Sequence, residues 1–425
     1  MSPRSSKLSN TLAGTSGNIL EWYDFAVFGF LAPVMSPLFF PEADPIAGLI
    51  QTYGVFAAGY LMRPLGGVLF GFIGDRLGRK RALQWSIFLM AIPTVVVGLL
   101  PTHEQLGATA ALLLILLRLV QGASVGGELV GSVAWLVETA DPRRRGLLGS
   151  WSLFGAISGI LLGSLVVTLL NAMLDESSMA SWGWRVPFLS GAVIFFVGLW
   201  LRRSMTESPD FEQATAAGAV QHNPLVHALR ENGGMVVHLV AMLLLYAAGF
   251  YMLFVWMPTY LDEMVKPPVP HALAVNTLSM VVLLAVIPLA GWLSDRVGRR
   301  PILLCASLTM AVVVYPLFVW VDGGTLQAAI TAQLIFAILI GCVQGPFPAL
   351  MVELFPAQSR FSAIGVSYNV SVALFGGTAP LVGTWLIART GDLASPALYL
   401  ALLSVLSFLA LLPLGRRSGA QPSTA

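Results

Sequence analysis

Residues 71–80 read GFIGDRLGRK and residues 291–300 read GWLSDRVGRR, so the pattern G-x-x-x-D-R-x-G-R-[KR] occurs twice in the chain. Each copy lies between two long apolar stretches. A second pair of sites supports the repeat, because Glu138 and Glu353 each precede an arginine by seven residues, with a proline between them. We therefore expect two related halves, each containing the same hairpin between two helices.

The composition indicates a membrane protein. Of the 425 residues, 56% are hydrophobic and 10% are charged, whereas a soluble globular chain carries about 25% charged residues. Each apolar stretch is long enough for the ~20 residues that a spanning helix needs. We expect an all-α membrane protein with twelve transmembrane helices, near residues 11–40, 46–74, 82–101, 107–138, 146–172, 184–202, 234–261, 271–294, 301–321, 325–353, 361–388 and 395–414.

The lysines and arginines predict the orientation of these helices. With both termini in the cytoplasm, 18 of the 23 lysines and arginines lie on the cytoplasmic side and 3 on the outer side. This distribution satisfies the positive-inside rule, so the basic loops indicate orientation and not nucleic acid binding. The two six-helix halves are expected at residues 1–202 and 234–425, joined by a polar cytoplasmic connector at residues 203–233.

Several acidic residues lie inside predicted spans, where ionisable groups are costly and usually functional. Asn18, Glu21 and Asp24 are spaced by three residues, which places them along one side of a helix. A carboxyl group in a low-dielectric setting can bind and release a proton near neutral pH. Asp24, Glu21 and Glu128 are therefore candidates for proton coupling. For Glu21, the alternative is an acid at the helix end in the membrane interface.

Two arginines, Arg63 and Arg118, also lie inside predicted spans. A guanidinium group offers a bidentate fork to a carboxylate, so both are candidates for substrate binding. We expect Arg63 to hold the substrate and Arg118 to pair with a carboxylate of the first span and set its protonation. The alternative is a purely structural ion pair.

Uncharged polar residues in the spans extend the set of substrate-binding candidates. This set comprises Asn18, Tyr23, Gln121, Gln344, Tyr368 and Asn369, in addition to the two arginines. For Asn369, a hydrogen bond between two helices is an open alternative. Tyr246 and Tyr251 are equally compatible with lining a site and with packing.

The motifs together resemble one family. Residues 17–25 read GNILEWYDF, residues 63–67 RPLGG, residues 121–128 QGASVGGE, residues 183–188 GWRVPF and residues 353–356 ELFP. With the repeated loop, they resemble the metabolite–proton symporter family of the major facilitator superfamily, whose members carry proline and betaine, α-ketoglutarate, shikimate or citrate-like acids. The resemblance implies the major facilitator fold, with two halves that rock around a central site. It also implies proton-coupled import of a small organic acid or zwitterion.

The resemblance further implies that the repeated loops act as latches between the cytoplasmic ends of the halves. Carboxylate and guanidinium groups form charge-assisted bonds, and Glu138 and Glu353 are expected partners of the loop arginines. For the arginines alone, the alternative is a role in topology and headgroup contacts. The candidate gating residues are Asp75, Arg76, Arg79, Glu138, Arg145, Asp295, Arg296, Arg299, Glu353 and Arg360.

The expected partners are a carboxylate or zwitterionic substrate, a proton and the lipid bilayer of the cell inner (plasma) membrane. We expect a monomer that needs no cofactor, metal or nucleic acid. A proton-coupled efflux antiporter and a membrane-embedded solute receptor without transport remain alternatives. An enzyme is not expected, because the sequence has no phosphate loop, nucleophile elbow or metal cluster.

Overall fold

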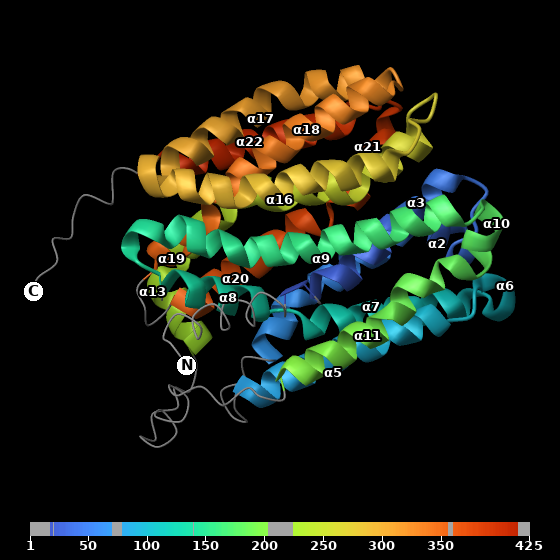
Figure 1. Ribbon diagram of the computed structural model, residues 1–425, viewed down its shortest axis with the longest axis horizontal. Coiled ribbons are helices and arrows are strands. Elements are labelled where there is room, and N and C mark those ends of the chain that lie inside the picture. The colour runs from blue at the N-terminus through green and yellow to red at the C-terminus, as the bar shows by residue number, and fades with distance from the viewer. Residues whose placement is uncertain are drawn as a thin grey trace, which may run out of the picture.

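The structure is a computed structural model that describes residues 18–19, 21–69, 79–138, 140–202, 224–355 and 360–414. In Figure 1, α9 (Arg145–Met173) and α16 (Ala272–Val297) run side by side through the middle of the molecule. Helices α17, α18 and α22 lie on one side of this pair, and α5, α7 and α11 lie on the other. We call residues 18–202 the N-terminal group and residues 224–414 the C-terminal group.

Helices make up all the regular structure of the described residues, so the prediction of an all-helical protein is confirmed for them. Before α9, the helix Glu21–Phe30 is followed by α2 (Ala32–Phe39), α3 (Pro45–Leu61), α5 (Arg79–Leu99), α6 (His103–Leu106), α7 (Ala108–Ser124), α8 (Glu128–Glu138) and η1 (Pro142–Arg144). Between α9 and α16 come α10 (Glu176–Ser178), η2 (Met179–Gly183), α11 (Arg185–Arg202), α13 (Pro224–Met242), α14 (Leu244–Phe250), η3 (Tyr251–Trp256), α15 (Met257–Thr259) and η4 (Tyr260–Met264). After α16 come α17 (Arg299–Asp322), α18 (Leu326–Gln344), α19 (Phe347–Glu353), α20 (Arg360–Ser371), η5 (Val372–Gly376), α21 (Ala379–Thr390) and α22 (Ser395–Leu411).

Seven helical stretches among the described residues are long and apolar enough to cross a membrane. An eighth results if Glu21–Phe30 and α2, which meet at a bend of 67° near Pro33, form one span. The seven agree with seven of the predicted spans to within a few residues. The count of twelve stays a prediction, because other candidates, such as Ser395–Leu411, are shorter apolar helices.

The outer faces of the helices are apolar, as a lipid environment requires. On α17, the exposed residues Leu308, Val312, Tyr315 and Val319 are spaced by four, three and four positions, which places them on one side of the helix. Leu398, with others on α22, forms a similar exposed stripe. Apolar surfaces of this extent are unusual on soluble monomers, so these stripes are the faces that meet lipid.

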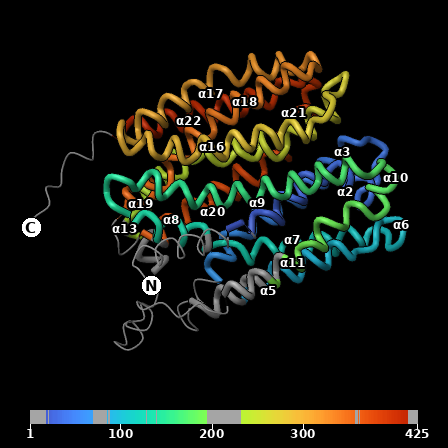
Figure 2. Tube along the Cα trace, viewed as in Figure 1, coloured from blue at the N-terminus to red at the C-terminus, as the bar shows by residue number. Residues whose placement is uncertain are grey.

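The seam between the two groups is built from small residues of α9 and α16. A Cβ atom on Gly291 would lie 2.6 Å from the carbonyl oxygen of Gly146, so the two backbones touch there. Toward the other end of the seam, the Thr277 hydroxyl lies 2.7 Å from that of Ser164 and 3.0 Å from that of Thr168. Small residues and hydroxyl groups are the usual means by which membrane helices associate closely. Figure 2 shows the two helices side by side, and these contacts show that they run in opposite directions.

The helix of the fourth predicted span, near residues 107–138, is interrupted at Val125, Gly126 and Gly127 between α7 and α8. A Cβ atom on Gly126 would lie 2.6 Å from the backbone nitrogen of Gly67 in the second span. Glycine is therefore required for the two spans to approach this closely. Irregular backbone at this depth is tolerated because neighbouring protein surrounds it.

Candidate functional site

Two buried ion pairs are stacked along the first span. Arg118 Nη1 lies 3.3 Å from Asp24 Oδ2, and Arg63 Nη2 lies 3.4 Å from Glu21 Oε1. None of the four side chains is more than 5% exposed. We call Glu21, Asp24, Arg63 and Arg118 the buried charge ladder. The expected pairing of Arg118 with a carboxylate of the first span is confirmed, and Glu21 is buried and paired where an interfacial position was the alternative.

The positions of these residues follow from helix geometry. Glu21 and Asp24 are three residues apart, close to one helical turn, so their carboxylates lie at successive levels on one face. Arg118 reaches Asp24 from α7. Arg63 reaches Glu21 from residues 63–69, the helical segment that follows α3. Three predicted spans therefore converge on the ladder.

Gln121 joins the ion pair of Asp24 and Arg118 to the third span. Its Nε2 donates to Asp24 Oδ2 and to Thr94 Oγ1, both at 2.8 Å, and its Oε1 accepts from Arg118 Nη1 at 3.0 Å. Thr94 in turn donates to the carbonyl oxygen of Met90 at 2.8 Å. Sequence analysis placed Gln121 among the substrate-binding candidates and missed Thr94. The one available signal was a hydroxyl in the apolar run AIPTVVVG.

Aromatic rings surround both guanidinium groups. The Arg63 Cζ atom lies 5.1 Å from the centre of the Trp22 ring and 5.4 Å from that of Tyr60. The Arg118 Cζ atom lies 3.9 Å above the centre of the Phe28 ring. Guanidinium groups stack well on aromatic faces because they are weakly hydrated. The rings therefore favour buried cations at these two positions.

The aromatic layer continues into the C-terminal group. The ring centres of Tyr60 and Tyr251 are 5.1 Å apart, and those of Tyr246 and Tyr368 are 6.0 Å apart. Tyr251 belongs to η3, a π-helical segment whose Phe254 carbonyl oxygen accepts from Asn276 Nδ2 at 2.9 Å. Single π-helical turns inside α-helices are frequent at functional sites. The candidate site thus includes tyrosines from both groups.

The structure brings some predicted substrate-binding residues to other contacts. Asn18 Nδ2 donates to Ser132 Oγ at 3.0 Å and links the first span to the fourth. The Tyr23 hydroxyl lies 2.9 Å from Ser190 Oγ in α11. Both side chains therefore tie helices of the N-terminal group together.

The remaining candidates lie near the boundary between the groups. Asn369 Nδ2 donates to the carbonyl oxygen of Gly126 at 2.7 Å, which joins α20 to the interruption in the fourth span. Gln344 is buried at the end of α18, and its Oε1 has no hydrogen-bond partner among the described residues. Glu128 begins α8, but its side chain lies outside the described part of the chain.

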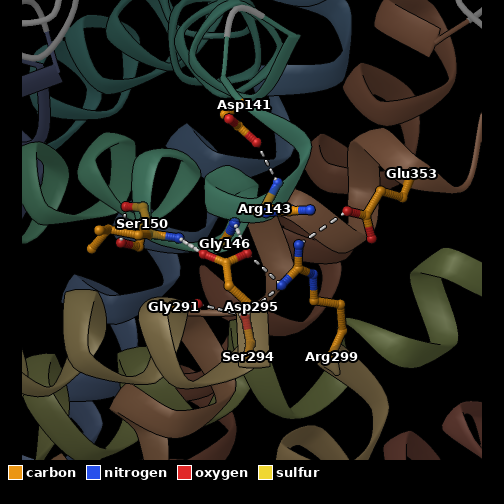
Figure 3. Close-up of polar contacts among 10 residues, drawn as sticks. Asp141, Arg143, Gly146, Ser150, Gly291, Ser294, Asp295, Arg299 and Glu353 are labelled. Atoms are coloured by element: carbon orange, nitrogen blue, oxygen red, sulfur yellow. Dashed lines mark hydrogen bonds and ion pairs between the residues drawn. The ribbon is translucent and has the colours of Figure 1, made fainter. Parts of the chain in front are cut away.

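Asp295 forms a contact between the groups at the predicted cytoplasmic end. Its two carboxylate oxygens accept from the backbone nitrogens of Gly146 at 2.7 Å and Leu147 at 2.9 Å, so it caps the first turn of α9 (Figure 3). Arg299 donates to Asp295 at 2.7 Å and to Glu353 at 3.1 Å. A carboxylate at a helix N-terminus is favourable because the helix dipole is positive there.

A second ion pair joins the groups at the same end. Arg360 Nη1 of the C-terminal group lies 2.6 Å from Glu138 Oε1 of the N-terminal group. Glu353 thus pairs with an arginine of the repeated loop, as predicted, whereas Glu138 pairs with Arg360, which lies outside both copies of the loop. We call Asp295, Arg299, Glu353, Arg360 and Glu138, together with the first turn of α9, the cytoplasmic latch.

Other predicted gating residues lie elsewhere. Arg296 was expected to pair with an acidic side chain. In the structure it is exposed, and its Cζ atom lies 3.9 Å above the ring of Trp292. Arg145 begins α9, and its Nε has no partner among the residues that the structure describes. Asp75 and Arg76 fall outside the described residues, and so does the side chain of Arg79.

The chain is similar to known transporters along most of its length. Residues 10–221 match the family model for "Sugar (and other) transporter", and residues 128–359 match that for "MFS/sugar transport protein". A proline/betaine transporter of Salmonella typhimurium is 33% identical over 407 residues, which cover 93% of this chain and 81% of the relative. A glycine betaine/proline/ectoine/pipecolic acid transporter, OusA, of Dickeya dadantii is 34% identical with the same coverage.

Solved structures show the same fold. The crystal structure of a D-xylose-proton symporter matches with a TM-score of 0.74 at 23% identity, and the match covers 96% of this chain and 97% of that chain. A partially occluded inward-open conformation of the xylose transporter XylE from E. coli matches with a TM-score of 0.76 at 20% identity, over 98% of this chain and 99% of that one. At these identities the likeness concerns the arrangement of helices and not the substrate.

Proposed function

The chain belongs to the major facilitator superfamily of transporters, and from this premise we propose that it imports a small zwitterion or organic acid together with a proton. Membership of the superfamily agrees with the resemblance drawn from the sequence motifs. It makes the protein a multi-pass membrane transporter and not an enzyme.

The observation that carries the proposal is the buried charge ladder. Two carboxylates lie buried on the first span, each with an arginine as its partner. Ionisable groups inside a membrane mark ion and proton pathways because their burial is costly. Protonation of Asp24 removes its negative charge and weakens its hold on Arg118. Asp24 can therefore bind a proton while Arg118 binds the anionic group of the substrate, and these two interactions replace the ion pair between them.

The cytoplasmic latch supports alternating access as the mechanism. Asp295 and Arg360 bond across the boundary between the groups at one end of the molecule. Release of substrate to that side requires these contacts to open while the central site stays assembled. At the other end, the hydroxyl groups of Tyr53 and Thr259 meet at 2.8 Å across the same boundary. A carrier that opens to one side at a time has to break and remake such contacts in turn.

The aromatic layer supports a zwitterion as the preferred substrate. Arginine provides a planar fork for a carboxylate, and aromatic faces attract ammonium groups. Tyr60 and Tyr251 present such faces from the two groups beside the ladder. The names of the relatives, which carry proline, betaine, ectoine and pipecolic acid, direct the first experiments to these compounds.

Transport by purified protein in proteoliposomes tests the proposal. An inward proton gradient should drive accumulation of labelled L-proline or glycine betaine, and a protonophore should abolish it. Accumulation that needs the opposite gradient would indicate an antiporter. Binding without any flux would indicate a receptor and would refute transport.

A further inference from the structure

We propose that Arg118 holds the substrate carboxylate through the side-on edge of its guanidinium group, formed by Nε and Nη2. The inference rests on the proposed function and names the anion subsite within it. It gives Arg118 the role that sequence analysis expected for Arg63. The subsite would take a carboxylate because a planar group with two acceptor oxygens matches that edge.

The hydrogen bonds of Arg118 are confined to one corner of its guanidinium group. Nη1 donates to both Asp24 Oδ2 at 3.3 Å and Gln121 Oε1 at 3.0 Å. Among the described residues, neither Nε nor Nη2 has a hydrogen-bond partner, and the side chain is 1% exposed. Buried polar groups are almost always paired, so two adjacent unpaired donors on one edge indicate a ligand with two acceptors.

Arg63 does not offer the same edge. Its Nη2 donates to Glu21 Oε1 at 3.4 Å, and its buried Nε has no partner within the described part of the chain. The protein therefore already uses one of the two nitrogens that form the side-on edge of Arg63. A carboxylate on that edge would share Nη2 with Glu21, whereas both nitrogens of the edge of Arg118 lack a partner among the described residues.

The Gln121 amide holds the guanidinium group of Arg118 in one orientation. Thr94 uses its single hydroxyl hydrogen on the Met90 carbonyl, so toward Gln121 it can only accept. The amide nitrogen of Gln121 must therefore face Thr94 and Asp24, which leaves its oxygen for Arg118 Nη1. This clamp fixes the corner of the guanidinium group from which the free edge extends.

The aromatic rings fix the plane of the same group. The Arg118 Cζ atom lies 3.9 Å from the Phe28 ring centre and 5.6 Å from that of Phe25. A guanidinium group stacked on a ring presents its edges and not its face to a ligand. Clamp and rings together preorganise the free edge, which favours tight and selective binding.

This arrangement gives a direct route to coupling. Asp24 and the substrate carboxylate would share one cation, at opposite sides of the guanidinium group. On Asp24, Oδ2 accepts both protein donors, whereas Oδ1 has no partner among the described residues and is the atom open to a proton. The negative charge of a substrate carboxylate bound to Arg118 disfavours the ionised form of Asp24, so substrate binding promotes proton binding. By the same coupling, a proton on Asp24 promotes substrate binding.

Binding to detergent-purified protein, measured by thermal shift and calorimetry, tests the assignment. The probes are L-proline and L-prolinamide, which differ only in the carboxylate, with glycine betaine and its amide as a second pair. We expect wild type to prefer each carboxylate at least about tenfold. Arg118→Lys keeps the charge but lacks the planar fork, so we expect affinity for the carboxylates to fall roughly 30-fold. Arg63→Lys is the matched control and should keep the preference.

A second pair of variants guards against misfolding of Arg118→Lys. Thr94→Val keeps the shape but removes the acceptor for Gln121, and we expect the carboxylate preference to fall about threefold. Thr94→Ser should restore it. The assignment is overturned if Arg118→Lys folds and keeps the wild-type preference, or if Thr94→Val and Thr94→Ser both match wild type. Failure of wild type to bind any carboxylate probe would overturn the proposed function as well, whereas these variant results would leave it standing.

Discussion

The N-terminal and C-terminal groups repeat the same loop but differ in their buried chemistry. The N-terminal group contains the four charged residues that are fully buried among the described residues, namely Glu21, Asp24, Arg63 and Arg118. Within its described part, the C-terminal group buries uncharged polar side chains, such as Asn276, Gln333, Gln344 and Asn369, and its nearly buried carboxylate, Asp295, belongs to the latch. A buried charge in a membrane is costly, so it is expected to persist only where it has a use. The comparison supports the proposal that the N-terminal group handles the proton.

The ends of the two groups that are predicted to be cytoplasmic show the opposite relation. In the latch, charged side chains contact residues of the other group: Asp295 caps α9, and Arg360 pairs with Glu138. Glu138 is 46% exposed and Arg360 20%, so their ion pair costs less to form than the buried pairs of the ladder, whereas Asp295 is only 6% exposed. The two groups therefore share the charges that hold them together but not those that lie in the centre. The following experiments are arranged from the largest expected effect to the smallest.

Asp24→Asn is expected to have the largest effect, and it tests the proposal that the N-terminal group handles the proton. Asparagine keeps the shape and polarity of aspartate but cannot titrate, so we expect proton-driven accumulation to be lost while counterflow exchange persists in part. Uptake into proteoliposomes with and without a proton gradient measures both. Asn369→Ala in the C-terminal group is the control, and it should alter exchange without removing the response to the gradient. Full gradient-driven accumulation by Asp24→Asn would move the proton to Glu21 or Glu128.

Stability should also differ between the two groups. Arg118→Leu leaves Asp24 buried without its cation, so we expect the free energy of unfolding to fall by about 3–5 kcal/mol. Asn276→Leu removes the donor to the Phe254 carbonyl, with an expected loss of about 1–3 kcal/mol. Denaturant titrations in detergent measure both values. Equal losses would show that breaking an ion pair of the ladder costs no more free energy of unfolding than breaking an amide hydrogen bond, and this would contradict the difference between the groups.

The latch should control rate and not affinity. Asp295→Asn removes one acceptor and the charge that caps α9, which costs about 0.5–2 kcal/mol at a helix N-terminus. We expect transport to slow by about 2-fold to 30-fold, while equilibrium binding of substrate changes by less than about threefold. Initial uptake rates and binding isotherms separate the two effects.

Asp392→Asn is a matched control for this experiment. Asp392 Oδ1 accepts from the backbone nitrogen of Ala394 at 2.9 Å, a contact that stays within the C-terminal group. It should leave transport nearly unchanged. Asp75→Asn compares the first copy of the loop with the second, since the repeat predicts the same slowing there. Lost binding with normal exchange in Asp295→Asn would contradict a latch.

The smallest effect is expected at Arg296. The repeat places it beside Asp295, but it stacks on the exposed Trp292 ring. Surface changes of this kind usually alter stability by less than about 0.5 kcal/mol, so Arg296→Gln should change the uptake rate by less than about twofold. A slowing as large as that of Asp295→Asn would place Arg296 in the latch.

The burial of a residue was easier to predict from the sequence than its contact partners. The four charges of the ladder were all identified because an ionisable residue within an apolar stretch is conspicuous. Thr94 was missed because a single hydroxyl in a membrane helix usually bonds to its own backbone, as Thr94 also does. The substrate-binding roles of Asn18 and Tyr23 stay predictions, and the contacts of these side chains with Ser132 and Ser190 could not be read from spacing along one helix.

The sequence by itself determined the membrane class, the repeat and the ionisable residues inside the spans, because these depend on local composition and spacing. Only the tertiary structure decided which donors stay unpaired. Arg118 and Asp24 are 94 residues apart in the chain, and Asn369 and Gly126 are 243 apart. Their contacts depend on how helices pack and rotate against one another, and spacing along one helix carries no information about that. The free edge of Arg118 is of this kind, because it exists only after Gln121 and Asp24 have taken the other corner.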